Sequence, residues 1–491
     1  MNMAAATEDQ TGKTEGERAP FAFLVTIFTV NVLAFFNMVG ILVAMVSIAA
    51  ALDAPRHLTL QLPTALYIAV ACAAPATPWL LDRLGARRLL LASIAGMSLT
   101  TLAAALTASF WPLLAILFAH GLFCAPVSPA TQAAVSQRMG ESQRGIGMAV
   151  WGAGNYASYL IGPLLAGWLL VHVGWQAILL MPLGFAMLAL PLVLLAVPRA
   201  VPVFVGADAA TLALAPLAVL LLLATASLGP ALGWSSPLVL ACIAGTAIAM
   251  PLYAWRYKHT PEPRFSMHCL RDPFVGLSLL MVLVYNLFST GLFQLEFIGQ
   301  ETSLGADFMG VRTAVGGGAL LIGFIAGGWL IRGRHLAATL LGGIVVTLLG
   351  KAGVLAYNIH LSEFWALWPQ IVVSIGFGMV TAALATFAYR TAPTVLAPHI
   401  ATAFILAIYM GASLGAGILE EAYDLFDSID LSGGMTEAGA TLDAFRSEFL
   451  VELIGVALLL IPAVMLVRRD AALAKAQAEA GANSARTSPH Q

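Results

Sequence analysis

Three ionisable residues, Glu296, Arg312 and Lys351, each lie within an apolar stretch long enough to cross a bilayer. A charged group inside a membrane-spanning helix is expensive, and it normally faces protein or a water-filled path rather than lipid. The chemistry open to such groups is proton exchange or the binding of a charged solute. The sequence therefore places candidate functional groups in its C-terminal half.

Glu296 belongs to a polar stripe, because its neighbours recur at steps of three and four along one helical face: Asn286, Ser289, Phe293, Glu296 and Gln300. We predict that Glu296 is an exchangeable proton site and that Arg312 or Lys351 modulates it. The alternative is that the two bases extend outward to lipid headgroups or water.

Other polar residues within apolar stretches are candidates for the lining of a central cavity: Asn37, His120, Asn155, Ser158, Asn286, Gln294 and Gln370. Each can equally form a hydrogen bond between helices. His120 is also a candidate for proton coupling, because imidazole titrates near neutral pH. A buried, hydrogen-bonded, neutral imidazole is the alternative for this residue.

Composition points to a membrane protein with many passes. Hydrophobic residues make up 60% of the 491 residues and charged residues 10%, whereas soluble domains carry about 25% charged residues. The net charge of −2 gives no reason to expect nucleic acid as a partner. The four cysteines have no metal-ligand or disulfide spacing, and no cofactor is expected.

Apolar segments of about 20 residues can cross a bilayer as helices. The sequence predicts fourteen: 21–49, 58–81, 88–108, 111–137, 145–172, 175–197, 210–228, 236–255, 273–299, 307–331, 336–357, 363–389, 396–418 and 446–467. Lys and Arg concentrate in alternate connections, which predicts cytoplasmic N- and C-termini.

The predicted segments divide the all-α chain into five parts. Residues 1–20 are an N-terminal tail, 21–197 a six-helix bundle, and 198–272 two inserted helices with their linkers. Residues 273–467 form a second six-helix bundle with an outer loop at 420–446, and residues 468–491 are expected to be a disordered tail.

Two motifs carry a family resemblance. The segment 151–170 resembles the antiporter motif on the fifth helix of drug exporters of the major facilitator superfamily, through Gly154, Ser158, Gly162, Pro163 and Gly167. The connection 78–88 resembles the superfamily's inner loop between helices two and three, through Asp82, Arg83, Gly85 and Arg87. In that family the loop acts as an inner gate between the two bundles.

The resemblance extends to the fourteen-helix drug:proton antiporter branch. It implies a major facilitator fold and export of small, lipophilic or drug-like organic molecules by alternating access, coupled to proton influx. It also implies a monomer in the inner membrane, with an adaptor protein where the pump spans an envelope. An enzyme is not expected, because the short loops hold no converging catalytic groups; a transporter-like sensor would lack a soluble output domain.

Two departures from the branch bear on proton coupling. Asn37 stands where the branch has an acidic residue on helix one, and Leu117 stands where it has an arginine on helix four. Neither side chain titrates near neutral pH. Either the coupling site has moved, or the protein is a substrate-specific exporter or facilitator that does not use protons.

Overall fold

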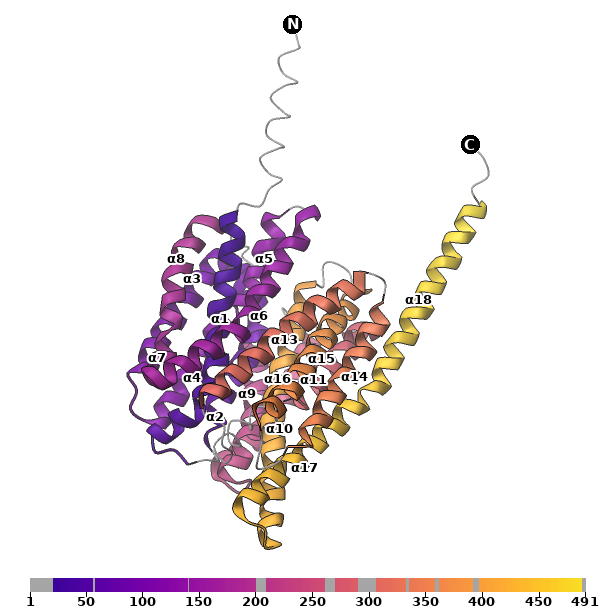
Figure 1. Ribbon diagram of the computed structural model, residues 1–491. Coiled ribbons are helices and arrows are strands. Elements are labelled where there is room, and N and C mark those ends of the chain that lie inside the picture. The colour runs from indigo at the N-terminus through magenta and orange to yellow at the C-terminus, as the bar shows by residue number, and fades with distance from the viewer. Residues whose placement is uncertain are drawn as a thin grey trace.

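The computed structural model describes residues 21–55, 58–139, 141–199, 209–260, 270–289, 306–332, 335–357, 362–391 and 397–487. Within these ranges the regular structure is helical throughout (Figure 1). The N-terminal half contains α1 (Phe21–Ala51), α2 (Gln61–Ala73), η2 (Ala74–Ala76), α3 (Thr77–Ala105), α4 (Phe110–Cys124), α5 (Val127–Arg138), α6 (Glu141–His172), α7 (Trp175–Leu180) and α8 (Pro182–Ala196).

Two further helices, α9 (Ala209–Leu232) and α10 (Pro237–His259), precede the C-terminal half. That half contains α11 (Pro273–Leu287), α13 (Ala306–Arg332), α14 (Leu336–Val354), α15 (Glu363–Ala388), α16 (Ala397–Ser432), α17 (Glu437–Leu458) and α18 (Leu460–Thr487). In Figure 1 the indigo and magenta helices form one bundle, and the orange and yellow helices form the other.

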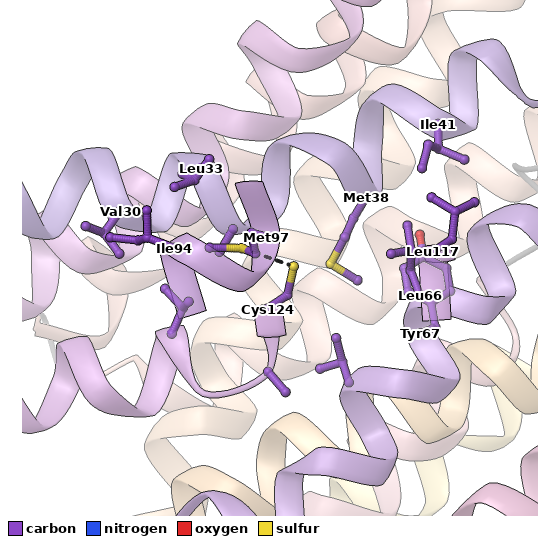
Figure 2. Packing of buried hydrophobic residues seen from close by; sticks show 14 of the residues in the cluster. Val30, Leu33, Met38, Ile41, Leu66, Tyr67, Ile94, Met97, Leu117 and Cys124 are labelled. Carbon is purple, nitrogen blue, oxygen red and sulfur yellow. Dashed lines mark hydrogen bonds between the residues drawn. The ribbon is translucent and has the colours of Figure 1, made fainter. Parts of the chain in front are cut away.

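Each bundle has its own apolar core. In the N-terminal bundle, α1, α2, α3 and α4 contribute buried side chains such as Ile41, Leu66 and Met97 (Figure 2). The core of the C-terminal bundle joins α11, α14, α15, α16 and α17. Helix α9 packs against both α2 and α16, so the inserted pair lies beside both bundles.

Eleven helices within the described residues are long and apolar enough to cross a membrane. One of these candidates runs from Gln61 to Ala105 and bends at Gly85, whose φ of 73° lies in the left-handed region that favours glycine. The count of eleven candidate spans does not confirm the predicted fourteen membrane-spanning helices. The predicted segment 273–299 is described only as far as residue 289, and α11 within it is a shorter apolar helix.

Two segments differ from their expected structure. The expected outer loop at 420–446 is largely helical, because α16 continues to Ser432 and α17 begins at Glu437 after a turn at Gly434. The expected disordered tail is helical as far as Thr487, where α18 extends beyond the bundles (Figure 1). Its alanine-rich sequence has high helix propensity, and Lys475 and Glu479 form an i,i+4 ion pair.

Local sequence explains how three site-forming helices are positioned. Helix α11 begins at Pro273 after Asp272, whose Oδ1 accepts a hydrogen bond from the Phe274 backbone N–H at 2.8 Å. Gly343 and Gly350 bring α14 against α15, where a β-carbon on Gly350 would lie 2.6 Å from Val373 N. Helix α17 begins after Thr436, whose hydroxyl caps it. These helices carry the polar groups described next.

Candidate functional site

A cavity of about 630 Å³ lies between the two bundles. Its wall is mostly apolar and aromatic, and both bundles contribute to it. The lining includes, from the N-terminal bundle, Met38, Tyr67, Trp151, Asn155, Tyr156 and Tyr159, and from the C-terminal bundle, Tyr285, Asn286, Arg312, Phe324, Gln370 and Tyr409. A wall of this composition suits a ligand with large apolar and aromatic surfaces.

Two aromatic pairs in the wall join the bundles. The rings of Tyr156 on α6 and Phe324 on α13 have centroids 4.7 Å apart. The rings of Tyr67 on α2 and Tyr409 on α16 have centroids 5.8 Å apart. Since each pair takes one ring from each bundle, relative movement of the bundles must change the shape of the cavity.

Arg312 is the charged side chain of the described cavity wall. It is 3% exposed, and its Nη1 donates a hydrogen bond to Gln370 Oε1 at 3.2 Å. Gln370 Nε2 in turn donates to Ser374 Oγ at 3.3 Å. Arg312 therefore does not extend outward to headgroups, and it brings guanidinium donors to a mostly apolar wall.

Three of the expected cavity residues do line this cavity, namely Asn155, Asn286 and Gln370. Ser158 does not, because its hydroxyl donates to the Asn155 carbonyl within α6 at 2.5 Å. Gln294 lies outside the described residues, as does Glu296. The predicted proton site at Glu296 therefore stays a prediction.

Asn37 and His120 lie inside the N-terminal bundle rather than in the cavity wall, which corrects the expectation for both. His120 Nε2 lies 3.2 Å from Asn37 Nδ2, and its Nδ1 lies 2.9 Å from Thr100 Oγ1. A neutral imidazole that accepts at Nε2 and donates at Nδ1 satisfies both contacts. The physical reason is that the Asn37 amide nitrogen and both ring nitrogens of His120 find partners where α1, α3 and α4 meet.

Leu117 stands where the fourteen-helix branch that the sequence resembles has an arginine. It is 1% exposed and packs in the same core (Figure 2). The Leu117 side chain itself cannot exchange a proton. The structure thus shows a packed, hydrogen-bonded core at the place where the branch has its N-terminal relay.

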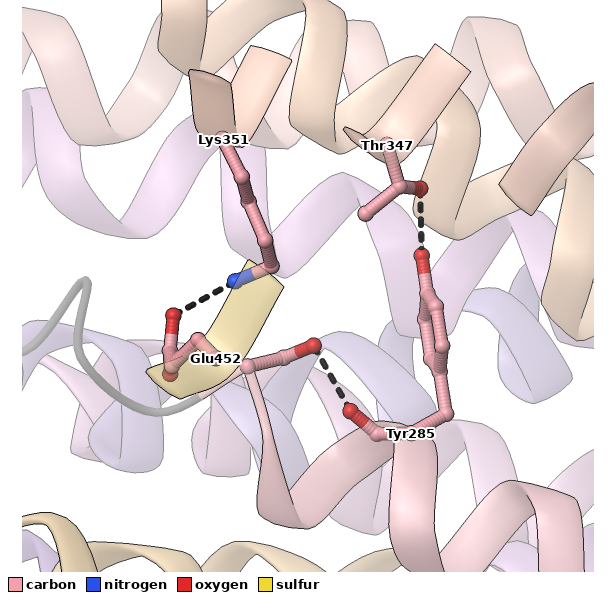
Figure 3. Close-up of polar contacts among 5 residues, drawn as sticks. Tyr285, Thr347, Lys351 and Glu452 are labelled. Atoms are coloured by element: carbon pink, nitrogen blue, oxygen red, sulfur yellow. Dashed lines mark hydrogen bonds and ion pairs between the residues drawn. The ribbon is translucent and has the colours of Figure 1, made fainter. Parts of the chain in front are cut away.

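Lys351 does not extend outward either, because it forms a buried ion pair (Figure 3). Its Nζ on α14 lies 2.5 Å from Glu452 Oε2 on α17, and both side chains are 0% exposed. One turn before Lys351, the Thr347 hydroxyl lies 2.6 Å from the Tyr285 hydroxyl of α11. The pair is therefore next to a residue of the cavity wall.

Glu448 lies one turn before Glu452 on α17 and is also 0% exposed. Neither of its carboxyl oxygens has a hydrogen-bond partner within the described residues. Sequence reasoning missed both glutamates, although they lie inside the predicted segment 446–467. Two acids four residues apart in an apolar stretch are a detectable signal, since they share one helical face.

Helix α6, which carries the antiporter-like motif, packs against α1 of its own bundle and α13 of the other. A β-carbon at Gly154 would lie 2.8 Å from the Phe28 carbonyl oxygen of α1. On the other side, a β-carbon at Gly310 would lie 3.0 Å from Gly167 Cα, and one at Gly317 would overlap the Tyr159 carbonyl oxygen. The backbones of α6 and α13 thus meet closely where the bundles join.

Two other motif positions differ in how tightly they pack. Gly162 has more room than Gly154, because a β-carbon there would lie 3.7 Å from Val39. Pro163 occurs inside α6, and its carbonyl oxygen lies 3.0 Å from the position of a β-carbon on Gly310.

The inner-gate motif lies at the bend in α3. Gly85 makes the bend, and the Arg83 guanidinium lies 5.3 Å from the centre of the Trp79 ring. Asp82 acts electrostatically on His399, near the start of α16 in the other bundle. Arg87 is half-buried. The motif is therefore positioned at a contact between the bundles, since α3 and α16 touch.

No group of three or more His, Cys, Asp or Glu side chains is placed to hold a metal ion in the part of the chain that the structure describes. The site is therefore built from aromatic, amide and a few charged groups. The arrangement offers solute binding between the bundles and a buried, ionisable cluster beside it.

Comparison with known proteins gives a consistent family. The sequence model of the family described as "Major Facilitator Superfamily" matches residues 27–416. A tetracenomycin C resistance and export protein of Streptomyces glaucescens is 26% identical over 352 residues, which are 69% of this chain and 64% of that protein. A multidrug resistance protein B homolog of Mycobacterium tuberculosis (strain CDC 1551 / Oshkosh) is 26% identical over 75% of this chain and 69% of its own length.

The chain thus matches less than two thirds of the length of the Streptomyces protein. Among solved structures, a POT family transporter in complex with 5-aminolevulinic acid superposes with a TM-score of 0.68. It shares 15% identity and covers 92% of this chain and 98% of its own. At this identity the likeness concerns the fold alone.

Proposed function

Because the chain belongs to the Major Facilitator Superfamily, we propose that it exports lipophilic small organic molecules across the bacterial cell membrane, in exchange for protons. The chain is a multi-pass membrane transporter with relatives named for multidrug and antibiotic export, and it is not an enzyme. The direction of transport, the proton coupling and the class of substrate are the proposal.

One observation carries the proposal: the aromatic cavity lies between the two bundles, and contacts in and beside its wall join them. Tyr156 and Phe324 meet in the cavity wall, and Gly317 meets the backbone of Tyr159 at the α6–α13 contact. Bundles that rock against each other would separate such contacts on one side of the membrane and form others on the opposite side. This is alternating access around a fixed central site.

A topology of fourteen passes with both termini in the cytoplasm fits this mechanism. The eleven candidate spans become fourteen if the bent span divides at Gly85 and if α6 and α11 also cross. In Figure 1 α1 begins and α18 ends on the same side of the molecule, as an even number of passes requires. The proposed inner gate, where Asp82 faces His399, then lies on the cytoplasmic side.

The cavity wall supports a preference for aromatic substrates that carry hydrogen-bond acceptors. Tyrosine and phenylalanine rings offer stacking surfaces. Arg312 and Gln370 offer donors at one place on the wall, which would fix the orientation of a bound molecule. Neutral or anionic aromatic molecules fit these groups better than cations, because the described charge of the wall is positive.

The test is reconstitution in proteoliposomes with an imposed pH gradient and a panel of cationic, neutral and anionic dyes. We expect uphill movement of neutral and anionic aromatic dyes when the gradient is present, and its loss when an ionophore removes the gradient. Tyr156→Ala should weaken dye binding, and Trp168→Ala is the control, because Trp168 is 55% exposed on the same helix. Equal weakening by both variants would contradict the cavity as the binding site.

A second candidate function is a facilitator or substrate-specific exporter that does not use protons. The packed core around Leu117 and the Asn37–His120 pair favours it, because the N-terminal bundle has no titratable acid at that place. Dye movement down its own concentration gradient, with no uphill accumulation when a pH gradient is imposed, would support this alternative over the first.

A further inference from the structure

The buried cluster between α14 and α17 contains more carboxyl groups than cations. Lys351 pairs with Glu452, while Glu448 has no hydrogen-bond partner within the described residues. Glu420 on α16 is 6% exposed and acts on Glu448 as a further acid. Lys351 can balance the charge of one carboxylate, and it already pairs with Glu452. An ionised Glu448 therefore has no cation of its own in this cluster.

A structural ion pair alone does not explain this arrangement. Lys351 and Glu452 are mutually satisfied, and the Phe449 ring lies 5.2 Å from the lysine Nζ. Glu448 makes no hydrogen bond to that pair within the described residues, and a buried carboxyl group without a hydrogen-bond partner is expensive to retain. A group of this kind, held in a low-dielectric site next to a lysine, is a candidate for exchange of an ion.

The exchanged ion is a proton rather than a metal ion. A hard metal cation requires several oxygen ligands in one place. No group of three or more metal-ligating side chains is placed together among the described residues. A proton requires a single carboxyl oxygen, and the oxygens of Glu448 are unpartnered in the described structure.

We propose that Glu448 is the proton-carrying group of the transport cycle, with Lys351 and Glu452 as its fixed electrostatic neighbours. This inference rests on the proposed proton coupling. A proton from the outer water forms an O–H bond with the Glu448 carboxylate, and the cluster of Lys351, Glu452 and Glu448 becomes neutral. The O–H bond breaks when the bundle has turned inward, and the proton leaves to the cytoplasmic water.

Lys351 has two carboxyl groups within one helical turn of α17, since Glu448 and Glu452 are four residues apart. When Glu448 carries a proton, Lys351 remains paired with Glu452, as in this structure. When Glu448 is ionised, both carboxylates attract the same ammonium group. The contact between α14 and α17 therefore differs between the two protonation states, which supplies a two-state element.

The cluster has a direct route to the cavity through α11. The Tyr285 hydroxyl bonds to Thr347, one turn from Lys351, and Glu452 acts electrostatically on Tyr285 (Figure 3). The Tyr285 ring lies in the cavity wall. Its centroid is 5.1 Å from that of the Phe377 ring, which also lines the cavity. A change of charge in the cluster therefore changes the electrostatic potential at Tyr285, an aromatic residue of the cavity wall.

The charged and titratable groups that act on the cluster come from the elements around it. Lys351 comes from α14, Glu420 from α16 and Tyr285 from α11, while Glu452 shares α17 with Glu448. Glu420 lies beside Asp424 and Glu421 of its own helix. It is therefore connected to the acidic end of α16, whereas Glu448 is fully buried on α17.

The experiment compares two transport assays in proteoliposomes containing the full chain. Glu448→Gln keeps the size of the side chain and cannot exchange a proton. We expect uphill dye transport driven by a pH gradient to fall at least about tenfold. We expect exchange of labelled for unlabelled dye, which needs no net proton movement, to stay within about twofold. Glu448→Asp should restore part of the gradient-driven transport.

Glu421→Gln is the matched control, because it makes the same chemical change at an exposed position. It should leave both assays at the wild-type level. If Glu448→Gln retains gradient-driven transport, the inference is wrong while the proposed function stands. If the wild-type protein exchanges dye but shows no uphill transport when a pH gradient is imposed, proton coupling fails and the inference fails with it.

A second measurement does not depend on transport. Infrared difference spectra of the purified protein between acidic and alkaline buffer should contain the carbonyl band of a protonated carboxyl group. Glu448→Gln should lose this band, and Glu421→Gln should retain it. Identical spectra for wild type and Glu448→Gln would overturn the assignment even if no substrate were found.

Discussion

The contact between α6 and α13 makes a sharp prediction about a single methyl group. Gly317 lies where a β-carbon would overlap the Tyr159 carbonyl oxygen of the other bundle. Because that oxygen belongs to a helix backbone, it cannot move aside as a flexible side chain would. Gly317→Ala should therefore force α6 and α13 apart in the conformation seen here.

The size of the effect follows from the cost of overpacking. Inserting a methyl group into a close-packed contact costs about 1–3 kcal/mol, and each 1.4 kcal/mol is about a tenfold change in an equilibrium constant. If the alternate conformation separates α6 from α13 at this point, Gly317→Ala should shift the population toward it by about 5- to 150-fold. Transport slows because the cycle must return through the disfavoured state.

The assay measures dye exchange together with the labelling rate of single cysteines placed on each side of the cavity. Gly328→Ala is the control, because it adds the same methyl group on the same helix, where nothing lies within 4 Å. We expect Gly317→Ala to change the ratio of labelling rates and to slow exchange, and Gly328→Ala to do neither. Equal behaviour of the two variants at equal expression would refute the role of this contact.

Three further predictions concern other parts of the molecule. Gly85→Ala should lower the thermal unfolding midpoint, because a β-carbon costs about 1–3 kcal/mol at φ 73° and ψ 159°. Gly342→Ala is the control, because nothing lies within 4 Å of a β-carbon there. Equal midpoints for the two variants would contradict the prediction. Lys351→Met should destabilise the protein by about 3–5 kcal/mol by leaving a buried carboxylate without its cation. The double variant Lys351→Met/Glu452→Gln should recover most of that loss, and failure to recover would argue against the ion pair. Arg312→Gln should raise the KM for anionic dyes by about tenfold and leave neutral dyes little changed; equal effects on both dye classes would show that Arg312 acts on the fold.

The sequence predicted the helical membrane architecture well, because long apolar segments allow few other structures in lipid. It also singled out Lys351 and Arg312 as candidate functional residues, since a charge in an apolar stretch is conspicuous, but it left open whether they extend outward; the structure buries both. The bend at Gly85 fell inside a motif already noted for its resemblance. These features depend on local composition, which a sequence shows directly.

The partners of the charged residues were harder to predict. Lys351 and Glu452 are 101 residues apart, and their contact depends on how α14 and α17 are rotated against each other. A change of one residue in either helix turns its side chains by about 100°. For the same reason, His120 and Asn37 were expected in the cavity, whereas they point toward each other inside one bundle.

Helix ends were the other source of error. The acidic segment after Glu420 was expected to be a solvated, partly structured hairpin; it is a hairpin of two helical ends, because α16 and α17 continue through most of it. Charge excludes a segment from the lipid but does not prevent it from forming a helix. In α18, high alanine content extends the helix beyond the point where apolar residues end.

The central claim is that solute crosses the membrane because the two bundles move relative to each other around the aromatic cavity. The most direct test places cysteines at Tyr156 and Phe324, whose rings meet across the bundles, in a chain whose native cysteines are replaced by alanine. A short cleavable thiol cross-linker should stop dye exchange, and cleavage of the linker should restore it. Exchange that continues at the same rate while the bundles are linked would contradict the account.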